Sequence, residues 1–408
     1  MIRSALRRSA ALPALPVLLA AVAAHIALRP RPWAYEWFWA VYQFNFVTIL
    51  IGPLLAGIAA WEGWRCSAAA DLLDTGAQPR RVAAVSWLAT FLWGLLVFAV
   101  GLVAVCVIVR LAGTPGAPPL AAIATVLPAI ALVAAECAVG LLVGWWVRHV
   151  LAAPAAALGC FLLSLWLYVS GPTVLIQVGG ASGSMIGASV RVVPAMAQVA
   201  YFAAIVLLAV LLLARPRPWS RAGAAQSALA SLAPVATAGI LVLGSASFLV
   251  AQGPDRLQPA PEALVCVGTA PQVCVAAGYV RYAAGARAAL LPYLSRLTEA
   301  GVPVPAKFAQ NANPGELTVG PIESTLLLGR TDGAGFAVIN SYLSKQCPID
   351  QDPALQTEWN GIISWLYAGS VPISVDDASI PSIVRGPQTP TQLAWVKAAM
   401  AHLAACGR

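Results

Sequence analysis

Residues 82–109 read VAAVSWLATFLWGLLVFAVGLVAVCVIV and contain no charged side chain, whereas Arg80, Arg81 and Arg110 flank them. A helix needs roughly 20 apolar residues to cross about 30 Å of hydrocarbon. This stretch is longer than that requirement and is bounded by charge on both sides. It therefore predicts a transmembrane helix.

The composition extends this prediction to much of the chain. Of the 408 residues, 60% are hydrophobic and 10% are charged, and the mean hydropathy is +0.80, whereas an ordinary soluble domain is about 25% charged. So few charges cannot cover a water-soluble globule of this size. The net charge is +8, but the basic residues lie in short clusters between apolar runs. We therefore expect contact with a lipid bilayer and no nucleic-acid partner.

Seven apolar stretches are long enough to be spans. Pro154 and Gly159 interrupt the fifth, but both residue types are tolerated in bilayers when neighbouring helices satisfy the freed backbone groups. We predict an all-α polytopic membrane bundle with about seven transmembrane helices over residues 1–252. The predicted spans are approximately residues 12–28, 41–60, 82–109, 120–143, 153–169, 195–214 and 229–251.

The arginines near the span ends predict the orientation, because cytoplasmic loops carry an excess of positive charge. Ten arginines flank one side of the predicted bundle and four flank the other. This count places the N-terminus in the cytoplasm and everything after the seventh span outside. The excess of Arg over Lys and the abundance of Ala suggest a GC-rich bacterial genome, so we expect the chain in a bacterial plasma membrane.

The first span has a second interpretation. An Arg-rich start, an apolar stretch and the small residues Ala20–Ala24 are also compatible with a cleaved signal peptide. Cleavage would leave six spans and the same external C-terminal domain. The loop after this span contains Trp33, Tyr35, Trp37 and Trp39, which we expect at the level of the lipid headgroups.

Residues 253–408 are predicted to form a small extracytoplasmic α+β domain. Apolar segments at 263–267 and 272–276 suggest a strand pair around a turn, and Tyr282–Ala300 has the apolar spacing of an amphipathic helix. Asp352-Pro353 and Thr389-Pro390 each place a capping residue before a proline at the first helical position, which predicts two further helices.

The eight cysteines divide evenly between the two regions. Four lie in or beside apolar segments, and Cys266, Cys274, Cys347 and Cys406 lie in the C-terminal domain. An even set in one polar domain favours disulfides and an oxidising compartment. We favour the pairs Cys266–Cys274 and Cys347–Cys406, which are one of three possible connectivities.

The residues give little support to an enzyme. Glu136 is the one acid well inside a predicted span, where an ionised group is costly and usually faces a bundle interior or a cavity. It is either a residue of a substrate or proton path or a protonated carboxyl group bonded to a neighbouring helix. The three histidines lie on different segments, so we expect no metal site, no cofactor and no catalytic triad.

The connection between the second and third spans holds the most informative polar residues. It is predicted to be a short amphipathic helix, a turn and a basic segment, which together could dock a soluble partner. The headgroups of the membrane are the alternative contact. The residues concerned are Trp61, Glu62, Trp64, Arg65, Asp71, Arg80 and Arg81.

The order of Glu-x-x-Arg, Asp-Leu-Leu and Pro-Arg-Arg between two apolar spans resembles actinobacterial permease subunits of type-2 ABC exporters, over roughly residues 12–214. The resemblance implies transport, a separate nucleotide-binding ATPase docked on residues 61–81, and a homo- or heterodimer of permease subunits. The chain has no G-x-x-x-x-G-K-[ST] phosphate loop of its own. The seventh span and the C-terminal domain depart from the six-span plan of that family. The alternative function is a membrane-anchored extracytoplasmic binding or sensing protein.

Overall fold

The structure is a computed structural model in which the chain forms two compact units. The helical unit comprises Met1–Ala112 and Gly116–Ala260, and the second unit comprises Gly113–Pro115 and Pro261–Arg408. The structure describes residues 2–29, 32–72, 79–180, 183–213, 224–260, 263–310, 312, 319–322, 324–327, 333–343, 347, 349–367, 380–385 and 387–406.

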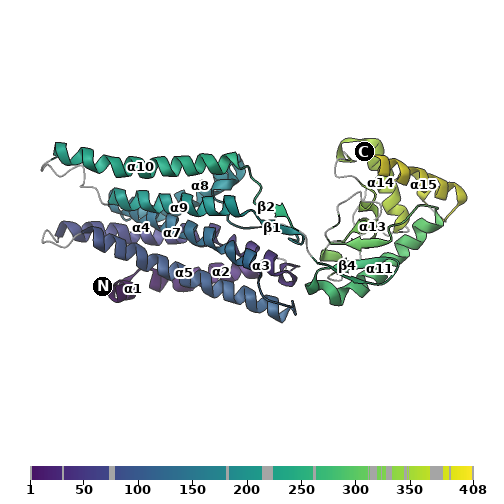
Figure 1. The fold of residues 1–408 in the computed structure, drawn as a ribbon, viewed down its shortest axis with the longest axis horizontal. Coiled ribbons are helices and arrows are strands. Elements are labelled where there is room, and N and C mark those ends of the chain that lie inside the picture. Colours follow the sequence, from purple (N-terminus) through teal and green to yellow (C-terminus); the bar gives the residue numbers. More distant parts are fainter. Residues whose placement is uncertain are drawn as a thin grey trace. The chain divides into compact units, whose positions relative to one another are not determined.

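Long helices dominate the helical unit and run side by side (Figure 1). A short antiparallel pair of strands, β1 (Ala188–Val190) and β2 (Leu257–Pro259), joins the segment before α9 to the segment after α10. The helices are α1 (Ile2–Arg8), α2 (Ala11–Ala27), α3 (Trp37–Asn45), α4 (Thr48–Leu72), α5 (Pro79–Leu111), α6 (Leu120–Ala124), α7 (Val126–Val147), α8 (Ala152–Ser170), α9 (Val192–Leu213) and α10 (Ala224–Ala251).

Six helical stretches among the described residues are long and apolar enough to cross a membrane. A seventh is reached only if α1 and α2, which meet at a bend of 63°, are taken together as one span. The first predicted span, residues 12–28, corresponds to α2 of this bent pair. The six stretches are Trp37–Ala68, Arg81–Leu111, Leu120–Val147, Ala152–Ser170, Val192–Leu213 and Ala233–Ala251.

Small residues bring α4 and α7 into close contact at the centre of the unit. A Cβ atom added to Gly144 would lie 1.8 Å from the carbonyl oxygen of Ala60, and one added to Gly140 would lie 2.0 Å from that of Ala56. Only glycine permits the two backbones to approach this closely, as at other membrane helix interfaces. The central packing therefore depends on backbone contact as well as on apolar side chains.

The second span differs from the prediction at both ends. It begins with α3 at Trp37, and α4 continues to Leu72, well beyond the predicted end at residue 60. Residues 61–72 are helical, as predicted, but they continue the long helix α4 and do not form a short helix of their own. Trp33, Trp37 and Trp39 are buried within the unit, so their rings pack against protein, and their position at the level of the headgroups stays a prediction.

The second unit is a small α+β fold. Its sheet has the order β3-β4-β5-β6, in which β3 and β4 are antiparallel and the other neighbours are parallel. Helices α11 and α13 pack against this sheet. Its elements are β3 (Val265–Val267), β4 (Gln272–Val275), α11 (Val280–Glu299), β5 (Lys307–Ala309), β6 (Val319–Pro321), α12 (Ser324–Leu327), α13 (Ala334–Asn340), α14 (Pro353–Leu366) and α15 (Pro390–Ala405).

The second unit contains two disulfides. Cys266–Cys274 joins facing residues of the β3–β4 pair, and Cys347–Cys406 joins positions that are 59 residues apart. The caps of α14 and α15 have the predicted form, since the Asp352 carboxylate accepts hydrogen bonds from backbone N–H groups of its helix and the Thr389 hydroxyl does the same for α15. These bonds satisfy donors that a helix start leaves unpaired.

Candidate functional site

Two of the membrane-length helical stretches are interrupted at positions that lie side by side in the helical unit. The break between α3 and α4 follows Asn45, and the break between α6 and α7 lies at Thr125. The Asn45 side-chain amide donates to the Thr125 hydroxyl at 2.8 Å and to its carbonyl oxygen at 3.0 Å. Backbone groups freed at such breaks need partners in a membrane. The contact therefore ties the two interruptions together.

The connection between α8 and α9 packs onto this break. Gly180, whose φ is +92°, donates its backbone N–H to the carbonyl oxygen of Tyr42 at 2.9 Å. The Glu36 carboxylate, at the start of α3, accepts from the Ser184 hydroxyl at 2.7 Å and from the Met185 backbone N–H at 2.8 Å. These bonds hold the connection across the end of the helical unit that lies away from α1. We call this end the opposite end, and the end that contains α1 the N-terminal end.

A cavity of about 520 Å³ opens at the opposite end, and we call it the opposite-end cavity. Its volume falls in the range of small-molecule sites. Two arginines and three aromatic rings dominate its wall, together with Asp255 near β2. The described lining residues are Arg29, Tyr42, Phe46, Tyr168, Gln177, Gly180, Gly183, Ser184, Met185, Pro254, Asp255, Arg256 and Leu257.

Arg256 is the most unusual residue of this wall. It is only 8% exposed, and its Nη2 donates to the carbonyl oxygen of Val174, while Nε and Nη1 have no hydrogen-bond partner. Burial lowers the pKa of Arg256 to about 10, with a smaller lowering from nearby Arg191 and an opposing contribution from Tyr42. The group therefore remains charged at neutral pH with unused donors.

Arg29 contributes the second positive charge. Its guanidinium carbon lies 5.0 Å from the centroid of the Phe46 ring, which is a cation–π contact. Burial lowers the pKa of Arg29, and the nearby Tyr168 hydroxyl acts in the other direction. The cavity thus offers positive charge directly beside aromatic surface.

A narrower cavity adjoins the first one and extends to Glu136. Phe46, Tyr168 and Gln177 line both cavities. The narrow cavity has about 20 Å³, which is room for about one water molecule. The Phe46 and Tyr168 rings meet edge to face with centroids 6.1 Å apart, at the boundary between the two spaces.

Glu136 lies on α7 in the middle of the bundle and is 8% exposed. Its Oε2 has no hydrogen-bond partner. A Cβ atom at Gly52 of α4 would lie 1.6 Å from this oxygen, so the missing side chain of Gly52 makes room for the carboxyl group. The described residues thus place an unsatisfied acid next to an internal cavity.

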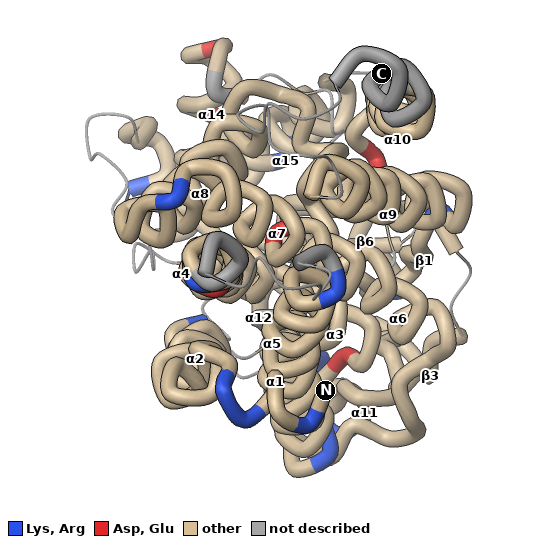
Figure 2. The backbone as a smooth tube through the Cα atoms, turned by 90° about the vertical axis from the view of Figure 1, so that its left-hand side faces the viewer, with Lys and Arg blue, Asp and Glu red and all other residues tan. Residues whose placement is uncertain are grey.

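The predicted partner-docking residues lie at the N-terminal end, but not in one exposed loop. Glu62, which we expected at the surface, is buried, and its Oε1 accepts from the Ala10 backbone N–H at 2.5 Å, next to the start of α2. Arg65 is exposed and lies 3.6 Å from Glu62, and Trp61 packs edge to face on Trp64. Figure 2 shows Lys and Arg at α1 and beside α4 at this end.

The rest of that predicted set begins α5 or lies near the end of α4. Arg80 and Arg81 belong to the first turn of α5, and Arg81 is exposed. Asp71 lies in the last turn of α4. The side chains of Asp71 and Arg80 lie outside the described part of the structure, so their predicted role in docking stays a prediction.

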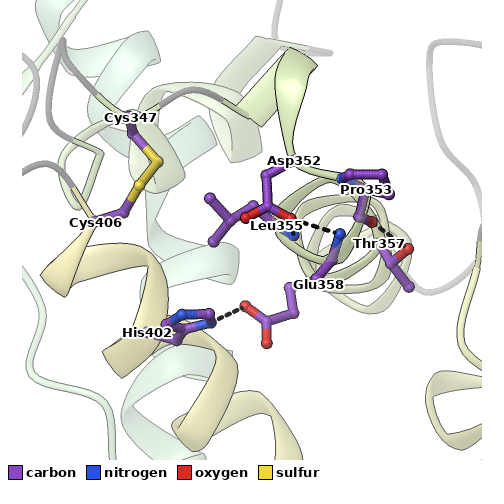
Figure 3. Close-up of polar contacts among 9 residues, drawn as sticks. Cys347, Asp352, Pro353, Leu355, Thr357, Glu358, His402 and Cys406 are labelled. Carbon is purple, nitrogen blue, oxygen red and sulfur yellow. Dashed lines mark hydrogen bonds and ion pairs between the residues drawn. A yellow bond between two sulfur atoms is a disulfide. The ribbon is translucent and has the colours of Figure 1, made fainter.

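Among the described residues of the second unit, no buried charged side chain lacks a hydrogen-bond partner. Its His402 ring nitrogen lies 2.8 Å from the Glu358 carboxylate, between α15 and α14 and near the Cys347–Cys406 disulfide (Figure 3). This pair is partly exposed to solvent. Among the described residues of the whole chain, no group of three or more His, Cys, Asp or Glu side chains could hold a metal ion.

Comparison of the chain with protein-family models, with curated proteins and with solved structures gives no match. The site must therefore be interpreted from its own chemistry.

Sequence reasoning identified Glu136 but missed the two arginines of the opposite-end cavity. Arg29 is one of the four arginines that flank the less basic side of the predicted bundle, and Arg256 follows α10 in a Pro-rich segment. The only available signal was that Arg256 comes directly after an apolar span.

Proposed function

We propose that the chain is the permease subunit of an exporter that is driven by a separate ATPase. The observation that carries this proposal is the pair of adjoining cavities that lead from the opposite end of the helical unit to Glu136. A charged group at the centre of a membrane helix costs at least about 2.5–3.5 kcal/mol, and such residues usually belong to substrate or ion paths. A bundle that only anchors the second unit needs no such group.

The proposed topology places the N-terminal end of the helical unit in the cytoplasm of a bacterial cell. With α1 and α2 taken as one span, seven spans carry the chain to the external side after α10. The two disulfides of the second unit support an oxidising, extracytoplasmic location. The excess of arginines at the N-terminal end supports the same orientation.

The ATPase would dock at this cytoplasmic end. Two long helices reach it, because α4 continues to Leu72 and α5 starts at Pro79. Arg65 and Arg81 are exposed there and are available to a partner, whereas buried Glu62 positions the start of α2. A second permease subunit, identical or homologous, would complete the transporter, as the resemblance of residues 12–214 to exporter permeases implies.

The test is affinity purification of the full chain in a mild detergent, with mass spectrometry of the retained proteins and an ATPase assay. We expect a stoichiometric nucleotide-binding subunit with the wild-type chain. The double variant Arg65→Glu with Arg81→Glu should lose this subunit, because it reverses the two exposed charges at the proposed contact.

Lys397→Glu is the matched control, since it reverses an exposed charge on α15 of the second unit and should retain the subunit. Recovery of the wild-type chain alone, without ATPase activity in several detergents, would contradict the proposal. That result would favour a membrane-anchored protein that binds or senses a ligand with its second unit.

A further inference from the structure

We propose that the opposite-end cavity binds the phosphate group of an amphipathic phosphoester between Arg29 and Arg256, with the apolar part of the ligand against Phe46 and Tyr168. This inference names the ligand class of the cavity that the proposed function assigns to transport. It rests on that function only for the claim that the ligand is moved through the membrane.

The first argument is the incomplete hydrogen bonding of Arg256. A buried guanidinium group loses its hydration and needs acceptors in exchange. The structure supplies one acceptor, the carbonyl oxygen of Val174, and leaves Nε and Nη1 without partners. An anion in the adjoining cavity would supply the acceptors that the protein lacks.

The second argument is the charge of the cavity wall. The described lining contains two arginines and one acid, Asp255, whose side chain is exposed. Among the described residues, no ion pair joins Asp255 to either arginine. Arg191 lies nearby, but its guanidinium already donates to the carbonyl oxygens of Gln252 and Asp255. In the described structure neither arginine of the wall forms an ion pair, and the buried Glu36 carboxylate behind the wall is bound by Ser184 and Met185.

The third argument concerns the form of the anion. One guanidinium group can bind a carboxylate through two parallel hydrogen bonds, which leaves the second arginine without a counterion. A phosphate monoester has three terminal oxygens and a phosphodiester has two, and either can accept from two guanidinium groups at once. A cavity with two arginines from different elements, α2–α3 and α10–β2, therefore favours phosphate over carboxylate.

The fourth argument is the apolar surface beside the charges. Arg29 lies on the Phe46 ring, and Phe46 contacts Tyr168 at the entrance to the narrow cavity. Met185 and Leu257 add further apolar surface to the wall. A ligand whose phosphate reaches Arg29 would thus place its next carbon atoms on these rings, which favours an amphipathic ester over inorganic phosphate.

The experiment measures binding to the purified full chain in dodecyl maltoside, a phosphate-free detergent. Hexyl phosphate is titrated by calorimetry, with inorganic phosphate and hexanoate as comparison ligands. We expect the wild type to bind hexyl phosphate more tightly than either comparison ligand. Arg256→Gln and Arg29→Gln should each weaken this binding roughly tenfold or more, because each removes one charge-assisted contact.

Arg110→Gln is the matched control, since it removes an exposed arginine that stacks on Trp37 and does not line the cavity. Its affinity for hexyl phosphate should equal that of the wild type. Thermal unfolding of each variant checks its fold, and Arg29→Gln keeps the test decisive if Arg256→Gln does not fold.

Measurement of the phospholipid phosphorus that remains on the purified protein separates two sources of the phosphate. Phospholipid retained by the wild type and lost in Arg256→Gln would identify a membrane lipid as the ligand. Binding of hexyl phosphate without retained phospholipid would identify a soluble phosphoester.

Equal affinity of the wild type and both cavity variants would overturn the inference, as would hexanoate binding as tightly as hexyl phosphate. Binding is measured without an ATPase. The inference can therefore fail while the ATPase co-purifies, and it can hold when no ATPase is found.

Discussion

The helical unit and the second unit place their apolar side chains in opposite ways. The helical unit exposes large apolar side chains along its spans, such as Val103 at 62%, Leu163 at 54% and Ile240 at 69%. In the described part of the second unit, only Val265 and Leu291 are exposed large apolar residues. The exposed apolar surface of the helical unit is suited to contact with lipid, and the more polar surface of the second unit is suited to contact with water.

The units also differ in how they are held together. The helical unit relies on close backbone contact at Gly140 and Gly144, since lipid provides no hydrophobic drive for helices to associate. The second unit has a compact apolar core beneath α11 and two covalent crosslinks. Small domains in oxidising compartments often need such crosslinks because their cores are small.

The largest effect that distinguishes the units is expected from removal of the Cys347–Cys406 disulfide. Replacing both cysteines by serine should destabilise the second unit by about 4 kcal/mol, because the bond closes a loop of 59 residues in the unfolded chain. Thermal unfolding of the full chain in detergent, followed by limited proteolysis, measures this loss. The helical unit should remain protease-resistant.

The paired replacement of Cys266 and Cys274 is the internal comparison for this prediction. Their sequence separation is 8, so the loop-closure argument gives a smaller loss of roughly 2–3 kcal/mol. Loss of helical-unit integrity in either paired variant would contradict the independence of the two units. Equal losses in the two variants would contradict the dependence on loop length.

A smaller effect is expected from arginine at exposed leucines of the two units. Leu163→Arg in α8 should disfavour membrane insertion by about 3 kcal/mol, because a charge near the centre of a span is costly. Leu291→Arg in α11 should be tolerated, because this leucine is 39% exposed in a water-facing unit. The measurement is the yield of full-length, monodisperse protein extracted from membranes.

The comparison between the units fails if the two arginine variants give the same yield. Equal and normal yields would show that the exposed face of α8 does not contact lipid. Equal and reduced yields would show that Leu291 is covered by protein or lipid in the membrane. Only a selective loss for Leu163→Arg agrees with the assignment of solvents.

Much of the architecture follows from sequence pattern alone. Long uncharged runs such as residues 82–109 must form helices in lipid, and the capping pairs Asp352-Pro353 and Thr389-Pro390 mark the starts of α14 and α15. The boundaries of the second span were less predictable. Trp is a residue type typical of membrane interfaces and Glu is a residue type typical of the surface. Trp37 and Glu62 are nevertheless buried inside the unit by segments distant in sequence.

The candidate site was only partly predictable for the same reason. A lone acid inside an apolar run identifies Glu136 without any structure. Arg29 and Arg256 are separated by more than two hundred residues and lie in loops, so no local pattern could bring them to one cavity. The tie between Asn45 and Thr125 is also a contact between distant segments. Such sites depend on packing that periodicity does not encode.

The smallest effect that sharpens the comparison concerns the glycines of the helical unit. Gly144→Ala should destabilise it by about 1–3 kcal/mol, because the new methyl group would overlap the Ala60 carbonyl oxygen and force α4 and α7 apart. Gly159→Ala in α8 is the matched control, since a Cβ atom there meets nothing within 4 Å. Alanine also favours helix over glycine, so the control should unfold at the same or a slightly higher temperature. A fall in the unfolding temperature for Gly144→Ala alone would show that the close backbone contact between α4 and α7 stabilises the helical unit. Equal behaviour of the two variants would instead mean that side-chain packing elsewhere keeps α4 and α7 together.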